Sequence, residues 1–108
     1  MANEKIKTEL VVLGGGPGGY AAAFYAADLG KKVLLVDQDP RLGGVCLNRG
    51  CIPSKALLQA AMVVEQTRAA ERMGLSFGEP AIALEKLRSW KESIITRMSG
   101  GLKSLAEK

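Results

Sequence analysis

The chain has 108 residues, of which 47% are hydrophobic, 24% charged and 5% aromatic, and its formal net charge at pH 7 is +4. This length and balance fit one small globular domain with a modest core. Basic residues are interleaved with acidic ones and aromatic residues are few, which argues against nucleic-acid binding. The longest strongly apolar stretch, residues 20–27, is far shorter than the roughly 18–20 residues that a membrane span needs.

The N-terminal residues contain no apolar region of the kind that a signal peptide has, since Ile6 is followed directly by Lys7. We therefore expect a cytoplasmic location. In that reducing compartment a disulfide is more often catalytic than structural.

The first predicted element is an apolar, β-branched run at residues 9–13, which stops at the glycine-rich segment 14–19. This pattern predicts a buried parallel strand that runs into a glycine turn. A helix is predicted next, over residues 18–29, with Pro17 opening it and Gly30 closing it.

The glycine segment has the G-x-G-x-x-G spacing of dinucleotide-binding loops. In such loops the first glycine makes the tight turn, the second lets a pyrophosphate approach the backbone, and the third lets helix and strand pack closely. The helix N-terminus supplies N–H donors and partial positive charge to the phosphates. The predicted phosphate-binding residues are Gly14, Gly16, Pro17, Gly18 and Gly19.

A second apolar strand, residues 32–36, ends in Asp37. Asp37 follows Gly14 at about the 20-residue offset at which an acidic side chain binds the ribose hydroxyls of a dinucleotide. An acid at this position also disfavours a 2′-phosphate, which argues against NADP. The alternative is a surface aspartate at a strand end with no ligand. Residues 9–37 are predicted to form a βαβ dinucleotide-binding unit.

Both cysteines, Cys46 and Cys51, lie in segment 43–55 between glycines and a proline. On a regular helix these two side chains would lie well around the cylinder from each other. A bond between them therefore requires an irregular segment, which the glycines allow.

The residues after Cys51 favour a helix with Pro53 in its first turn, which places Cys51 at a helix N-terminus. The dipole there favours a thiolate, the reactive form of the side chain. With two cysteines and no histidine the chain does not supply a zinc site, and no metal is predicted. From the residues alone, a redox pair and an inert buried pair stay equally open.

Two amphipathic helices are predicted in the second half. The first runs from residue 52 to about 72 with Gly74 as its C-cap, and the second starts near residue 84 after a connector at residues 76–80. Gly100 and Gly101 are expected to loosen the second helix, at about 1 kcal/mol per glycine.

We expect three large side chains of this half to pack in the core rather than bind a ligand. They are Met62, Met73 and Trp90.

A dinucleotide unit followed closely by Cys46-x4-Cys51 resembles the flavin-dependent pyridine nucleotide–disulfide oxidoreductases. Residues 43–58, Gly-Gly-Val-Cys-Leu-Asn-Arg-Gly-Cys-Ile-Pro-Ser-Lys-Ala-Leu-Leu, are most similar to the dihydrolipoamide dehydrogenases of that family. The resemblance covers essentially the whole chain. It implies an α/β fold in which a Rossmann-like βαβ FAD-binding unit precedes the two long helices.

The resemblance also implies roles for single residues. FAD would lie on the glycine loop, with Asp37 on the adenosine ribose and Gln38 beside the adenosine; this acid is frequently glutamate in the family. Cys51 would be the thiolate that contacts the flavin, and Cys46 would exchange disulfides with the substrate. Further cofactor contacts would come from Gly43, Gly44, Val45 and Lys55.

The implied reaction is the oxidation of dihydrolipoamide to lipoamide, with electrons passing from the dithiol to FAD and then to NAD⁺. The implied partner is the lipoyl domain of the acyltransferase component of a 2-oxo acid dehydrogenase complex, and the implied oligomer is a homodimer.

Members of the family are several hundred residues long, with an NAD domain and a C-terminal dimer-interface domain that carries a histidine–glutamate pair. This chain has no histidine. We therefore expect residues 1–108 to be the N-terminal portion of an incomplete FAD-binding domain that is catalytically inactive by itself.

Three alternatives stay open. A sibling reductase acting on glutathione, a related disulfide or mercuric ion shares the cysteine spacing. A non-enzymatic dinucleotide-binding or scaffold module explains the glycines and Asp37 but gives no purpose to Cys46, Cys51 and Lys55. A structural protein would require both motifs to be coincidental.

Overall fold

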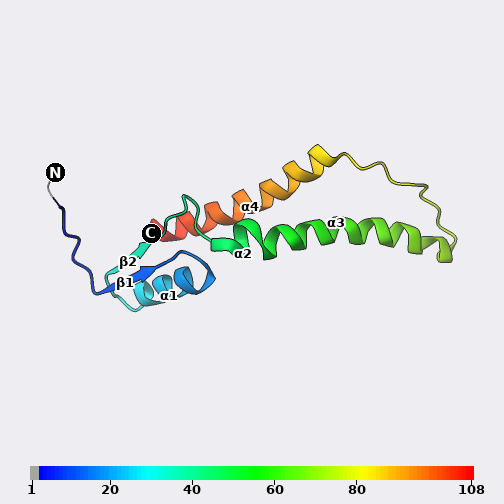
Figure 1. The fold of residues 1–108 in the computed structure, drawn as a ribbon. Helices are drawn as coiled ribbons and strands as arrows, with labels where there is room; N and C mark the ends of the chain where they lie inside the picture. The colour runs from blue at the N-terminus through cyan, green and yellow to red at the C-terminus, as the bar shows by residue number, and fades with distance from the viewer. Residues whose placement is uncertain (1–2) are drawn as a thin grey trace.

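The structure is a computed structural model that describes residues 3–108. Met1 and Ala2, which are part of the N-terminal stretch expected to lack a signal region and of the expected 1–108 domain, lie outside the described residues. In chain order (Figure 1) the elements are β1 Leu10–Leu13, α1 Pro17–Asp28, β2 Val33–Val36, α2 Gly44–Arg49, α3 Cys51–Ala69, the 3₁₀ turn η1 Ala70–Met73 and α4 Leu84–Ala106.

The first half is the predicted βαβ unit, but its first strand is not buried as expected: Leu10 and Leu13 are 39% and 81% exposed, because two strands and one helix leave much of the sheet without a covering layer. Strands β1 and β2 pair in parallel, with Leu10 opposite Val33 and Leu13 opposite Val36. Helix α1 connects them and packs against both strands, with Ala23 buried at the contact. Small alanine side chains let the helix approach the sheet closely. The α/β, Rossmann-like class with parallel strands followed by long helices is confirmed.

The cysteine segment differs from the prediction in one respect. Cys46 lies inside a short helix, α2, and not in an irregular stretch as expected. The irregularity is confined to Gly50, whose φ of −130° and ψ of −105° separate α2 from α3. Cys51 is the first residue of α3, as predicted. One break is enough, because it turns the second helix so that both cysteines face each other.

Helix α3 ends as the sequence indicated. Its last turn tightens into η1, and Gly74 follows in the left-handed region with a φ of +81°. The N–H of Leu75 then donates to the carbonyl of Ala70 at 3.1 Å. This arrangement satisfies carbonyl groups that a helix end leaves unpaired.

Helix α4 is continuous through Gly100 and Gly101, so the expected loosening is not seen. It packs against α2 and α3, and its buried residues are Ile95, which is only 2% exposed, and Ser99. These contacts hold the part of α4 that carries both glycines, which offsets their weak helix propensity.

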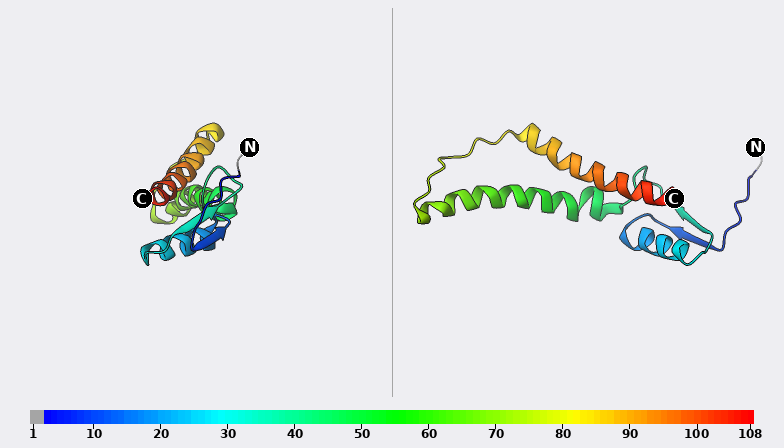
Figure 2. Two further views of the ribbon diagram at one scale, coloured as in Figure 1. Left: turned by 90° about the vertical axis from the view of Figure 1, so that its left-hand side faces the viewer. Right: turned by 180° about the vertical axis from the view of Figure 1, so that it is seen from behind.

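The expectation that Met62, Met73 and Trp90 fill a core is wrong. Their exposed fractions are 52%, 73% and 42%. Figures 1 and 2 show the reason: α3 and α4 lie together near α2 and separate toward the connector, so no second layer covers the far ends of the two helices. Helical periodicity identifies an apolar face but not what lies opposite it.

The described residues form an elongated body of 69 × 32 × 19 Å with a radius of gyration of 20.4 Å. A compact domain of this length has a radius of gyration of about 13 Å. Large apolar side chains stay exposed on the sheet as well as on the helices, among them Leu13, Val11 and Leu57. None of the described helices combines the length and apolarity that a membrane crossing requires.

We expect the 108-residue chain, expressed by itself, to self-associate and to bind flavin weakly, because contiguous apolar patches of this kind promote association. Sedimentation velocity over a range of concentrations measures the association. A chain that stays monomeric and holds FAD would contradict this expectation.

Candidate functional site

The glycine loop lies between the end of β1 and the start of α1, as predicted. Gly14 has a φ of +97°, and its N–H donates to the carbonyl of Val36 at 2.7 Å, which ties the loop to the end of β2. A Cβ atom on Gly19 would overlap the carbonyl oxygen of Gly14. The first and third glycines of the motif therefore have the roles that the spacing assigns to them.

The second glycine, Gly16, is the N-cap of α1 and provides no side-chain cap, and Pro17 occupies the first position of the helix. The first-turn N–H groups of Gly18 and Gly19 are thus without a capping side chain. Such unpaired donors at a positive helix end are what a pyrophosphate requires. The backbone here fits a dinucleotide phosphate, and binding through these residues stays a prediction.

Asp37 follows β2 and faces the glycine loop. Its Oδ1 accepts a hydrogen bond from the N–H of Asp39 at 3.0 Å, and its Oδ2 accepts one from the N–H of Gly15 at 2.8 Å. These two bonds, that from Asp39 first, hold the pKa of the Asp37 carboxyl below its ordinary value. An ionised carboxylate has lone pairs left for ribose hydroxyls, so the geometry fits the predicted role. The bond to Gly15 was not foreseen. Gln38 is exposed beside Asp37.

The Gly43–Gly44 turn joins the cysteine segment to the glycine loop. Both residues are left-handed, with φ values of +116° and +64°. The N–H of Gly43 donates to the carbonyl of Gly15 at 2.8 Å. A Cβ atom on Gly44 would lie 2.7 Å from the Cα of Gly16. Two backbones therefore meet here at a separation that only glycine permits.

Cys46 and Cys51 form a disulfide, with their Cα atoms 4.7 Å apart. Cys46 is half-buried in α2, whereas Cys51 is exposed at the N-terminus of α3. This helix end favours the Cys51 thiolate over the thiol when the disulfide is opened. An electrophilic disulfide with one stabilised leaving sulfur can undergo thiol exchange.

Lys55 and Val45 are both exposed next to this pair. Lys55 follows Cys51 by four residues in α3, so the two side chains share one face of the helix. The assignment of Lys55 and Val45 to a cofactor stays a prediction. In the part of the chain that the structure describes, no cluster of three or more histidine, cysteine or acidic side chains could hold a metal ion.

Asn48 was not singled out from the sequence. Its Nδ2 donates to the carbonyls of Gly44 and Leu42, at 2.9 and 3.3 Å. An asparagine inside a helix is a weak signal by itself, because such residues favour caps and turns. The turn that it holds is visible only in three dimensions.

The family model described as "Pyridine nucleotide-disulphide oxidoreductase" matches residues 8–108. Curated proteins named "Dihydrolipoyl dehydrogenase" from Vibrio cholerae and Haemophilus influenzae are each 50% identical to the chain over 105 residues, which is 97% of this chain and 22% of the relative. A protein of the same name from Buchnera aphidicola subsp. Acyrthosiphon pisum is 46% identical over 106 residues, 98% of this chain and 22% of the relative. The chain thus spans about a fifth of the length of these relatives.

Substitutions at adjacent glycines test the packing of the loop. Gly19→Ala is expected to destabilise the protein by about 1–3 kcal/mol, because the added methyl group overlaps the Gly14 carbonyl. Gly18→Ala is the matched control, since a Cβ there meets nothing within 4 Å; it should be neutral or stabilise by up to about 1 kcal/mol. Urea unfolding without added FAD measures both, and equal effects would refute the packing role of Gly19.

The hydrogen bonds to Asp37 give a pH dependence with a defined sign. Because the folded-state pKa lies below the ordinary value of 3.8, the folded protein binds fewer protons than the unfolded chain between the two values. The stabilisation is therefore complete above the unfolded pKa and is lost as the pH falls through the folded pKa. Asp37→Asn should flatten the decline of stability between about pH 5 and pH 2, as measured by denaturant unfolding at each pH. Parallel profiles of the variant and the native protein would contradict the assignment.

Proposed function

The chain belongs to the pyridine nucleotide-disulphide oxidoreductase family, and we propose that the intact protein oxidises protein-bound dihydrolipoamide to lipoamide, with FAD as its bound cofactor and NAD⁺ as the electron acceptor. One observation carries the proposal. The Cys46–Cys51 disulfide joins α2 to α3. The turn before α2 is hydrogen-bonded to the glycine loop, from the N–H of Gly43 to the carbonyl of Gly15. The names of the similar proteins support the lipoamide substrate.

The proposed chemistry of the cysteine pair is thiol–disulfide exchange. A thiolate of dihydrolipoamide attacks Sγ of Cys46, a mixed disulfide forms, and the Cys46–Cys51 bond breaks with Cys51 leaving as a thiolate at the α3 N-terminus. The second lipoyl thiol then attacks the lipoyl sulfur of the mixed disulfide. Lipoamide is released, and Cys46 leaves as the second protein thiol. Two electrons and two protons have then passed from the substrate to the protein and solvent.

The residues that would hold FAD are those that form the loop and its neighbours. The N–H groups after Gly16 would bind the pyrophosphate, Asp37 would accept hydrogen bonds from the ribose, and Gln38 would lie beside the adenosine. The Gly43–Gly44 turn, Val45 and Lys55 would lie along the rest of the cofactor. FAD supplies the two-electron acceptor between the reduced cysteine pair and NAD⁺ when bound.

We also propose the remaining parts of the assignment by family likeness. The NAD⁺ site and a histidine–glutamate acid/base pair would lie outside these 108 residues. The protein would be a cytoplasmic homodimer that receives its substrate on the lipoyl domain of the acyltransferase in a 2-oxo acid dehydrogenase complex.

Turnover by the intact protein with FAD, assayed with NADH and lipoamide, tests the proposal. Cys46→Ser and Cys51→Ser should each lower turnover by about a thousandfold or more, because disulfide exchange needs both sulfurs. Ser93→Ala, an exposed position on α4, is the control and should retain activity. Turnover with glutathione disulfide or mercuric ion in place of lipoamide would move the assignment to a sibling reductase, and absence of all three activities would refute an enzyme of this type.

A further inference from the structure

We propose that Asn48 is a positioning residue for the redox pair: its side-chain amide clamps the Gly43–Gly44 turn onto α2 and so fixes Cys46 relative to Cys51 and to the glycine loop. The significance of this clamp for catalysis rests on the function proposed above. Its effect on the disulfide itself does not, and can be measured without any substrate.

The orientation of the amide follows from its neighbours. Nδ2 of Asn48 lies 2.9 Å from the carbonyl oxygen of Gly44 and 3.3 Å from that of Leu42. Carbonyl oxygens only accept hydrogen bonds, so the NH₂ end of the amide must face them. Asn48 therefore donates both of its side-chain N–H groups to the segment that leads into α2.

This segment needs a clamp because of its composition. Helix α2 has six residues, which is too short to be stable by itself in water. Glycines flank it at both ends, Gly43 before it and Gly50 after it, and α2 has no side-chain cap at its N-terminus. Glycine backbones are free to move, and the Asn48 amide holds this turn by side-chain hydrogen bonds to Leu42 and Gly44. Cys46 lies between the two ends of this constraint.

The clamp belongs to a longer chain of hydrogen bonds. The turn that Asn48 holds donates from Gly43 N–H to the carbonyl of Gly15 at 2.8 Å, and the N–H of Gly15 donates to Asp37 at 2.8 Å. The helix of Cys46 is thus connected to the candidate ribose-binding carboxylate through one residue of the glycine loop, Gly15, which accepts with its carbonyl and donates with its N–H. A loosened turn would release Cys46 from both.

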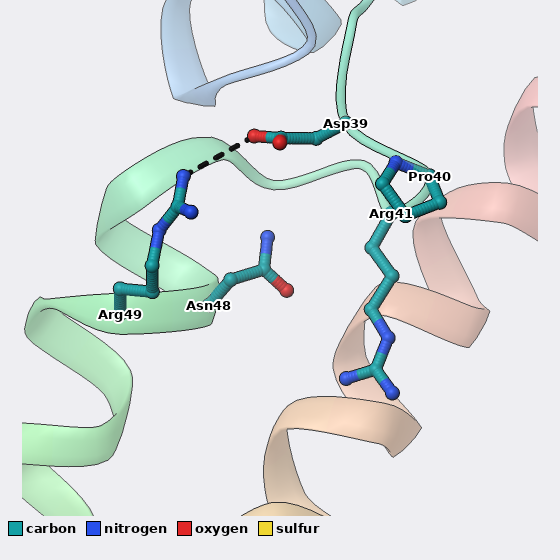
Figure 3. A pocket seen from close by; sticks show the side chains of 5 residues that line it. All are labelled: Asp39, Pro40, Arg41, Asn48 and Arg49. Carbon is teal, nitrogen blue, oxygen red and sulfur yellow. Dashed lines mark hydrogen bonds and ion pairs between the residues drawn. The ribbon is translucent and has the colours of Figure 1, made fainter.

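The other end of the amide shows that packing is not the reason for asparagine here. Oδ1 of Asn48 is buried and has no hydrogen-bond donor among residues 3–108. Figure 3 shows Asn48 between the Asp39–Arg49 ion pair, with an N–O distance of 3.3 Å, and the side chain of Arg41. A buried acceptor without a donor costs stability, and leucine would fill the same space without that cost. The donor bonds are what an apolar residue could not supply.

The test measures the thiol–disulfide equilibrium of Cys46 and Cys51 in the full-length protein. The protein is equilibrated with mixtures of reduced and oxidised dithiothreitol. Reduced dithiothreitol donates two electrons and two protons to each protein disulfide and is itself oxidised to its cyclic disulfide. Acid quenching, alkylation and peptide mass analysis give the fraction of Cys46–Cys51 that is bonded. Urea unfolding of each variant is measured in parallel.

Asn48→Leu should lower the equilibrium constant for forming the disulfide by about threefold to tenfold, the factor that corresponds to loss of one net hydrogen bond. Asn48→Asp keeps the shape but turns acceptor oxygens toward the two carbonyls, and should lower it at least as much. Gln59→Leu, the same change of an amide to leucine at an exposed position of α3, is the control and should leave it unchanged.

A purely structural role predicts a different result, namely lower stability in both redox states with an unchanged thiol–disulfide equilibrium. Folded Asn48→Leu and Asn48→Asp proteins with the native equilibrium constant would overturn the proposal. If both fail to fold, Asn48→Ala, which removes the amide donor and adds no bulk, is measured against the same criterion. If the native protein shows no lipoamide turnover but the Asn48 variants shift the thiol–disulfide equilibrium, the proposed function is refuted and the positioning role of Asn48 stands.

Discussion

The site depends on one close approach of two backbones. Gly15 and Gly16 of the loop after β1 meet Gly43 and Gly44 of the turn before α2, joined by the 2.8 Å bond from Gly43 N–H to Gly15 O. A side chain on Gly44 would collide with the Gly16 Cα. The contact brings the disulfide-bearing helices to the end of the βαβ unit, where a dinucleotide would lie. A disulfide reductase needs these two centres to be adjacent and rigidly placed.

Local order at this contact contrasts with the elongated shape of the chain. The described residues are 69 Å long, and the far ends of α3 and α4 separate from each other. Hydrogen bonds between glycine backbones define the site. Apolar burial elsewhere is slight, because two strands and one helical hairpin provide few opposing layers. The site is therefore formed by short-range backbone bonding and less by a large core.

Several parts of the structure followed from local patterns. The strand before the glycine loop, Pro17 at the start of α1, Cys51 at the start of α3 and Gly74 after η1 all lie where residue types indicated. Each depends on a preference that acts over a few residues: β-branched strands, proline in a first helical turn, glycine in a left-handed cap. Such preferences do not require knowledge of the rest of the chain.

Other features depended on contacts that no local pattern encodes. The periodicity of core residues is found at Met62, Met73 and Trp90. They are exposed nevertheless, because α3 and α4 separate from each other and leave these faces uncovered.

By itself the sequence determined the elements, the glycine motif and the presence of a cysteine pair, because these are set by neighbours along the chain. Only the tertiary structure decided that Gly15 is hydrogen-bonded to both Asp37 and Gly43, and that Asn48 holds the turn before Cys46. The Asp37 and Gly43 bonds join residues more than 20 positions apart in the sequence. Their geometry exists only after α1 has crossed over the sheet and brought the two glycine segments together.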